Sequence, residues 1–188
     1  MLPRLTYCWL CMVVFSNCAR LLGVDDGGVL LGPFLIPPSP QALVVHLPFQ
    51  CYLIFLLSGT LETGVFASDP ARYSWMLFLF WFFVTSLGAL LRIQETSSAS
   101  TLAFAWVWSR LNLLQRIDTL SGLEGRWLPW ILFWFEWIPS GLISPSVGVL
   151  VGCVYHVSAF VWPRRFGREL LPTPTFFYKL WPRRSARR

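Results

Sequence analysis

Two ionisable side chains, Glu136 and His156, lie inside long apolar stretches of this sequence. A charge within a membrane span is costly, so such a residue is by default a functional hypothesis. Glu136 lies nine residues past Trp127, which is about 13 Å along a helix, and His156 lies ten residues past Ser146. We expect the two side chains to reach a similar depth and either to pair or to face a wet cavity. A protonated Glu136 that is hydrogen-bonded locally is an equally weighted alternative.

Serines in the stretch 97–115 and His156 in the stretch 146–162 require a test for serine protease chemistry. A serine nucleophile needs a base within hydrogen-bond distance and an oxyanion hole. Rhomboid proteases supply these groups with a GxSG motif and with a histidine three residues before a GxxxG motif. The sequence contains no GxSG, and the residue three positions before Gly148 is Pro145, which cannot act as a base. We therefore expect no catalytic residue and no proteolytic activity.

Cys8 and Cys11 form a C-x-x-C motif, which is typical of a redox pair or of half a metal site. Their neighbours are apolar, and no second pair of cysteines or histidines has the spacing of metal ligands. We interpret the cysteines as small buried apolar residues and expect neither a metal nor a cofactor.

Gly148 and Gly152 form a GxxxG motif within the stretch 146–162. Small residues four positions apart let two helix backbones approach closely, which is how many helices associate in lipid. We expect a helix-packing seam at these glycines. The alternative is that both glycines face lipid.

The composition indicates what kind of protein carries these residues. Of its 188 residues, 55% are hydrophobic and 13% are charged, whereas a soluble domain has about 45–50% apolar and about 25% charged residues. Soluble enzymes, disordered chains and disulfide-rich secreted domains are excluded, and an integral membrane protein is predicted. Eight of the fifteen Lys and Arg residues lie between Arg164 and Arg188. This charge distribution favours a basic tail at a membrane surface and no nucleic-acid partner.

Six stretches approach the length of about 20 mostly apolar residues that a helix needs to cross a bilayer. The predicted spans are 5–22, 43–60, 73–91, 97–115, 127–143 and 146–162. A proline-rich irregular loop is expected between the first two spans. The predicted fold class is an all-α membrane protein, with a six-span domain over residues 1–163 and a short basic cytoplasmic tail over residues 164–188.

The distribution of basic residues predicts the orientation of the spans. With both termini in the cytosol, twelve Lys and Arg residues lie on the cytosolic side, two (Arg20 and Arg92) lie on the lumenal side, and Arg110 lies within a span. An excess of basic residues on the cytosolic side is the usual pattern. The competing interpretation is that residues 1–22 form a cleaved signal peptide, which leaves five spans and a lumenal N-terminus.

Several short motifs resemble those of the Derlin family, the rhomboid-like pseudoproteases of endoplasmic reticulum-associated degradation. The resemblance covers roughly residues 50 to 182, and its motifs occur in a consistent order. They are Leu61-Glu62-Thr63-Gly64, Val107-Trp108-Ser109-Arg110-Leu111-Asn112, Leu128-Pro129-Trp130, the pair Gly148 and Gly152, and the run from Thr173 to Pro182.

Three departures from the family pattern accompany the resemblance. No Trp-Arg pair occurs between Gly23 and Gln50, and Cys153 stands where many members have a histidine. The residues after Trp181 lack the Phe- and Gly-containing box with which some Derlins recruit a cytosolic AAA ATPase. We therefore expect any engagement of that ATPase to be indirect.

The resemblance implies a six-transmembrane-helix, rhomboid-like bundle in the endoplasmic reticulum membrane. It implies a non-catalytic role in the retrotranslocation of misfolded proteins, with misfolded clients, a membrane ubiquitin ligase complex and the lipid bilayer as partners. Polar groups at Gln115, Glu136 and His156 are expected to meet a passing chain. Two other functions stay open, namely a chaperone for membrane clients and a small-solute or proton-coupled transporter. A plastid-derived membrane is the alternative location.

The charge distribution gives a first testable prediction. Tags at both termini should be digested by protease in sealed microsomes, because both ends are predicted to face the cytosol. Protease protection of each tag, with a lumenal marker as control, measures this directly. A protected N-terminal tag, or loss of the first ~20 residues as a signal peptide, would contradict the six-span arrangement.

Overall fold

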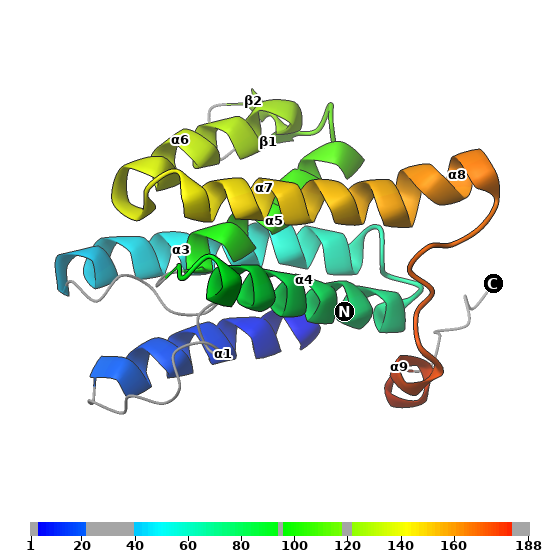
Figure 1. The fold of residues 1–188 in the computed structure, drawn as a ribbon, viewed down its shortest axis with the longest axis horizontal. Helices are drawn as coiled ribbons and strands as arrows, with labels where there is room; N and C mark the ends of the chain where they lie inside the picture. The colour runs from blue at the N-terminus through cyan, green and yellow to red at the C-terminus, as the bar shows by residue number, and fades with distance from the viewer. Residues whose placement is uncertain (1–3, 22–39, 94–95, 118–121, 182–188) are drawn as a thin grey trace.

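The structure is a computed structural model, and it describes residues 4–21, 40–93, 96–117 and 122–181. The chain is predominantly helical in these ranges (Figure 1). The helices are α1 (Arg4–Leu21), α3 (Pro40–Thr63), α4 (Pro70–Leu90), α5 (Ser97–Leu111), α6 (Leu128–Ser140), α7 (Ile143–His156), α8 (Trp162–Phe166) and α9 (Thr175–Leu180). The expected irregular loop before residue 40 and the arginine-rich residues 182–188 lie outside the described ranges.

Four short elements complete the described fold. Strands β1 (Arg116–Ile117) and β2 (Leu123–Glu124) pair antiparallel, with Arg116 opposite Glu124. A 3-10 turn, Gly125–Trp127, leads from β2 into α6. A π-helical segment, η4 (Val157–Val161), joins α7 to α8, so that one continuous helix runs from Ile143 to Phe166.

Two described helices are long and apolar enough to cross a membrane, namely Pro70–Leu90 and Ile143–Phe166. A shorter apolar helix covers Arg4–Phe15. Each predicted span overlaps a helix, but α5 has 15 residues and α6 has 13, which is less than the ~20 residues of a usual span. The count of six spans therefore stays a prediction.

Successive long helices run in opposite directions, so each end of the bundle collects alternating helix termini (Figure 1). One end carries the start of α1, the end of α3, the start of α4 and the continuation of α7 into α8; we call it the Glu62 end. The opposite end carries the start of α5 and the turn between α6 and α7; we call it the Ser144 end. The two ends hold different polar groups.

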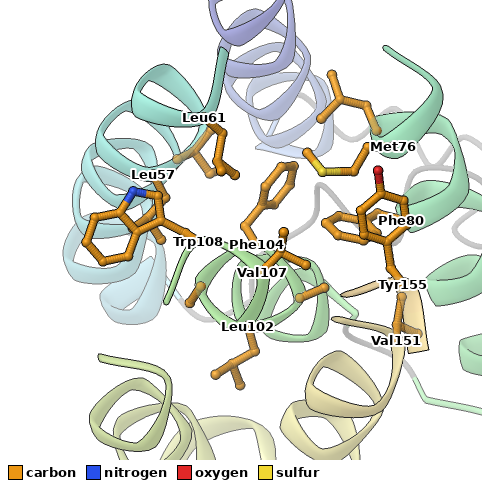
Figure 2. Close-up of a cluster of buried hydrophobic side chains, with 14 of the residues drawn as sticks. Leu57, Leu61, Met76, Phe80, Leu102, Phe104, Val107, Trp108, Val151 and Tyr155 are labelled. Carbon is orange, nitrogen blue, oxygen red and sulfur yellow. The ribbon is translucent and has the colours of Figure 1, made fainter. Parts of the chain in front are cut away.

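Helix α5 lies at the centre of the bundle, and every residue from Ser97 to Ser109 is buried. A helix buried on all sides must have neighbours all round. Figure 2 shows side chains from other helices, including Leu57, Phe80 and Val151, gathered around those of α5. Many of the α5 side chains are Ala, Ser or Thr, which lets the surrounding helices come close.

The closest approach is between α5 and α7. A Cβ atom added at Gly148 would lie 2.3 Å from the carbonyl oxygen of Ala99 and 2.8 Å from its Cα. A Cβ at Gly152 would lie 2.9 Å from the carbonyl oxygen of Ala103 and 2.8 Å from the Cβ of Trp106. Both glycines therefore face backbone that has no room for a side chain. Close contact of this kind gives the van der Waals attraction on which helix association in lipid depends.

This contact predicts that Gly148→Leu destabilises the folded bundle. The new side chain would meet the Ala99 backbone, and forcing extra volume into a packed interior costs about 1–3 kcal/mol or more. The free energy of unfolding in mixed detergent micelles measures the effect. Val154→Leu is the matched control, because Val154 is 50% exposed on the same helix, and should change that energy by less than ~0.5 kcal/mol. Equal stability of the two variants would show that Gly148 is not in a tight contact.

Candidate functional site

The carboxylate of Glu62, at the end of α3, caps the start of α1. Its Oε1 accepts a hydrogen bond from the backbone amide of Leu5 at 3.1 Å, and its Oε2 accepts from the amide of Thr6 at 2.8 Å. The hydroxyl of Thr6 also donates to Oε2 at 2.8 Å. The first amides of a helix have no partner within the helix, and a negative charge there is favourable. Glu62 thus ties α1 to α3 across 56 residues of sequence.

A chain of hydroxyl groups extends this cap into the bundle. The Oγ1 of Thr6 lies 3.1 Å from the Oγ of Ser58, which in turn contacts the hydroxyl of Tyr73. Tyr73 belongs to α4 and is fully buried. The indole Nε1 of Trp108, on α5, donates to the Oγ1 of Thr60 at 2.6 Å. Helices α1, α4 and α5 are therefore all linked by side-chain hydrogen bonds to the last turns of α3.

The other residues of the Leu61-Glu62-Thr63-Gly64 motif shape the end of α3. Leu61 is fully buried in the core. The hydroxyl of Thr63 donates to the carbonyl of Gly59 at 2.8 Å, within its own helix. A Cβ atom at Gly64 would lie 2.7 Å from the carbonyl oxygen of Thr60, to which the Gly64 amide donates. The absence of a side chain at Gly64 lets the chain turn tightly here.

Trp108 and Asn112 organise the exit from α5. The Nδ2 of Asn112 donates to the carbonyl of Trp108 at 3.1 Å. A Cβ atom at Gly125 would lie 2.4 Å from the Asn112 carbonyl oxygen and 2.9 Å from the Cζ3 of Trp108. Gly125 precedes α6, so the two motif residues form the surface on which the connection from the hairpin to α6 packs.

A second polar group lies at the Ser144 end. The hydroxyls of Ser98 on α5 and Ser144 on α7 are 2.7 Å apart and buried. The Nε2 of Gln50, on α3, donates to the carbonyl of Ser97 at 3.4 Å and to the Oγ1 of Thr101 at 3.3 Å. The sequence analysis considered the serines of the stretch 97–115 only as nucleophiles and did not predict the pairing of Ser98 with Ser144. The dense run of Ser and Thr at the start of α5 was the available signal.

The structure separates Glu136 and His156. Glu136 is 8% exposed and lies five residues before Gly141, near the Ser144 end. His156 is the last residue of α7 and stacks on Phe160, with ring centroids 5.8 Å apart. Helices α6 and α7 run antiparallel from one turn, so the depth of each residue is its distance from that turn. Counted in this way at 1.5 Å per residue, Glu136 and His156 lie about 14 Å apart along the helix axes. The expected similar depth does not hold because α6 ends at Ser140 and α7 begins at Ile143, each three residues earlier than the predicted spans. At this separation the two residues do not pair.

The bundle and its packing define the class of protein, a helical protein with two apolar helices of membrane-spanning length and a central helix packed through small residues. The chain matches the Der1-like family over residues 35–175 and belongs to that membrane-associated family. The resemblance to Derlins, drawn from the sequence motifs, is confirmed.

Similar proteins include several named Derlin-1. Derlin-1 of Caenorhabditis elegans is 30% identical over 149 residues, which cover 78% of this chain and 60% of that protein. Derlin-1 of Homo sapiens is 30% identical over 157 residues, covering 81% of this chain and 62% of that protein. Derlin-1 of Drosophila melanogaster is 27% identical over 201 residues, covering 96% and 82% respectively. The chain thus spans about three fifths of the length of the first two relatives.

The cap at α1 predicts a local effect of Glu62→Ala. Loss of a capping side chain costs about 0.5–2 kcal/mol, so the first turns of α1 should open more often. The rate of amide hydrogen exchange should rise in a peptide covering residues 4–12, while the rate in peptides from α7 should stay the same. Glu169→Ala is the control, because Glu169 is exposed and lies far along the chain. Unchanged exchange at residues 4–12 would mean that Glu62 does not hold α1.

Proposed function

We propose that this protein is a non-catalytic component of endoplasmic reticulum-associated degradation that assists the retrotranslocation of misfolded proteins to the cytosol. The observation that carries the proposal is the family match over residues 35–175. The residues that resemble the Derlin motifs also make structural contacts in this chain. Glu62 caps α1, Trp108 donates a hydrogen bond to Thr60, and Gly148 contacts Ala99.

The length and the exposed apolar surface of one helix support this role. Helix α6, which has 13 residues and an exposed apolar surface, is shorter than the hydrocarbon core that a usual span crosses. A short hydrophobic segment is accommodated by local thinning of the bilayer, which lowers the barrier that a polar chain must cross. Helix α6 also presents large exposed apolar side chains to its surroundings, among them Trp130, Trp134 and Ile138.

The geometry favours a protein without protease activity. Ser144 is hydrogen-bonded to Ser98. His156 lies twelve residues farther along the same continuous helix, about 18 Å away at 1.5 Å per residue. A histidine at that distance cannot serve as the base for either serine. This separation excludes His156 as the base for these serines and supports the non-catalytic role that we propose on the family match.

The partners and location proposed here follow the family assignment. The protein acts as a multi-pass protein of the endoplasmic reticulum membrane with both termini in the cytosol. It engages misfolded clients and a membrane ubiquitin ligase complex, and it reaches the cytosolic AAA ATPase indirectly. The separation of Glu136 from His156 gives no support to the transporter alternative, which needs the two residues as a relay. A chaperone that only binds membrane clients is an outcome of the test below.

The function is tested by the turnover of a misfolded lumenal client in cells that lack the protein. Pulse-chase measurement should show a longer client half-life on depletion and a normal half-life on rescue with the wild-type chain. Rescue with Ser98→Ala/Ser144→Ala should be as complete. Replacing both partners of a buried hydrogen bond by apolar groups is nearly neutral for stability, and neither serine is needed for chemistry.

Three outcomes are decisive. Unchanged client half-life on depletion would contradict the degradation role and favour a chaperone or transporter. Loss of rescue by the double serine variant at normal protein level would contradict the non-catalytic interpretation. On depletion, the client should accumulate in the lumen of the endoplasmic reticulum. Accumulation in the cytosol would place the defect after retrotranslocation and contradict the proposed role in that step.

A further inference from the structure

A basic hollow lies at the Glu62 end of the bundle, where α5 ends and α7 continues into α8. It has a volume of about 600 Å³, within the usual range for a ligand pocket. Its polar lining consists of three arginines, from two elements far apart in the sequence, and one histidine. These residues are Arg110, His156, Arg164 and Arg165.

Within the part of the chain that the structure describes, the residues around this hollow do not neutralise its positive charge. No acidic side chain lines it, and the ion pair that the described ranges contain, Arg126 with Glu124, involves none of its arginines. The guanidinium of Arg110 lies 4.6 Å from the centre of the Trp106 ring. A planar guanidinium held against a ring is pre-organised for binding a phosphate oxygen. The hollow therefore attracts an anion.

The wall of the hollow is built by an unusual helical segment. His156, Phe160 and Val161 line it, and the π-helical segment Val157–Val161 positions the last two. Such segments often mark functional sites. The Nη2 of Arg72, on α4, donates to the carbonyl of Ala159 at 3.1 Å, and its guanidinium lies 5.6 Å from the Phe160 ring. The packing thus fixes the irregular backbone beside the arginines.

Apolar residues complete the hollow. Leu111, Phe160 and Val161 line it together with the cations. It lies toward the end of the helix Ile143–Phe166, which is long and apolar enough to cross a membrane. Trp162 follows directly in the chain, and tryptophan is enriched where a span meets the headgroup layer. In a membrane, a phosphate group is attached to the acyl chains of a lipid. The arginines of the lining suit the phosphate, and the apolar residues suit the acyl chains.

We propose that this hollow binds the phosphate-containing headgroup of an anionic membrane phospholipid. Arg110, Arg164 and Arg165 contact the phosphate oxygens, and the apolar wall contacts the glycerol and the first carbons of the acyl chains. Arginine pairs strongly with phosphate through charge-assisted hydrogen bonds. Basic pockets beside spanning helices are suited to such headgroups. The inference goes beyond the proposed role in degradation and does not depend on it.

The test uses the full-length chain purified in neutral detergent micelles and titrated with dioctanoyl phosphatidylserine. Native mass spectrometry or calorimetry gives the affinity. Arg164→Gln/Arg165→Gln should weaken binding by about tenfold or more, because each basic residue near an anionic lipid contributes substantially. Arg168→Gln/Lys179→Gln removes the same charge from exposed positions outside the hollow, and should change the affinity by less than about twofold. Arg110→Gln removes a charge from the α5 side of the hollow and should also weaken binding. This variant decides the test if the double variant does not fold.

Two further ligands distinguish the source of the anion. Dioctanoyl phosphatidylcholine should bind much more weakly than the serine lipid, since it has no net negative charge. Inorganic phosphate at the same concentration should not displace the serine lipid. Equal loss of affinity in the hollow and control variants, full displacement by inorganic phosphate, or no saturable binding to the wild-type chain would each overturn the proposal.

Discussion

The contact between the backbones of α5 and α7 is the constraint on which the rest of the structure depends. Gly148 and Gly152 meet Ala99 and Ala103 at distances that leave no space for a side chain. Because this contact holds α5 fully inside the bundle, α1, α3, α4 and α6 can pack around it. In lipid, no hydrophobic effect drives helices together, so van der Waals contact between small residues must provide much of the attraction.

The two ends of the bundle hold different polar contacts. At the Glu62 end, one carboxylate and a chain of hydroxyls join α1, α3 and α4. At the Ser144 end, buried hydroxyls pair across α5 and α7, as Ser98 and Ser144 do. The two hydroxyls bond across the seam between α5 and α7, so this polar contact adds to the backbone contact in holding the two helices together. The short α6, whose apolar side chains are exposed, supports the proposed thinning of the bilayer.

The sequence predicted the helical class, the order of the helices and the family, because apolar length and local motifs depend on neighbouring residues. It also drew attention to Gly148 and Gly152, since a GxxxG spacing has a physical meaning within one helix. It did not predict that Glu62 caps α1, because a cap between helices depends on tertiary packing over 56 residues. The similar depth expected for Glu136 and His156 does not hold, because depth depends on where the turn between α6 and α7 falls, and hydropathy alone does not define that position. The hollow around Arg110 was missed because its π-helical wall leaves no signature in the sequence.

The most direct test of this account is the proximity of α5 and α7 in a lipid bilayer. Solid-state NMR on the full chain, labelled with ¹³C at glycine and alanine, should show a through-space correlation between the Cα of Gly148 and the carbonyl carbon of Ala99. Substitution Ala99→Ser should remove that signal and thereby assign it. A bundle that is otherwise folded in lipid and shows no such correlation would contradict the claim that this backbone contact holds the structure together.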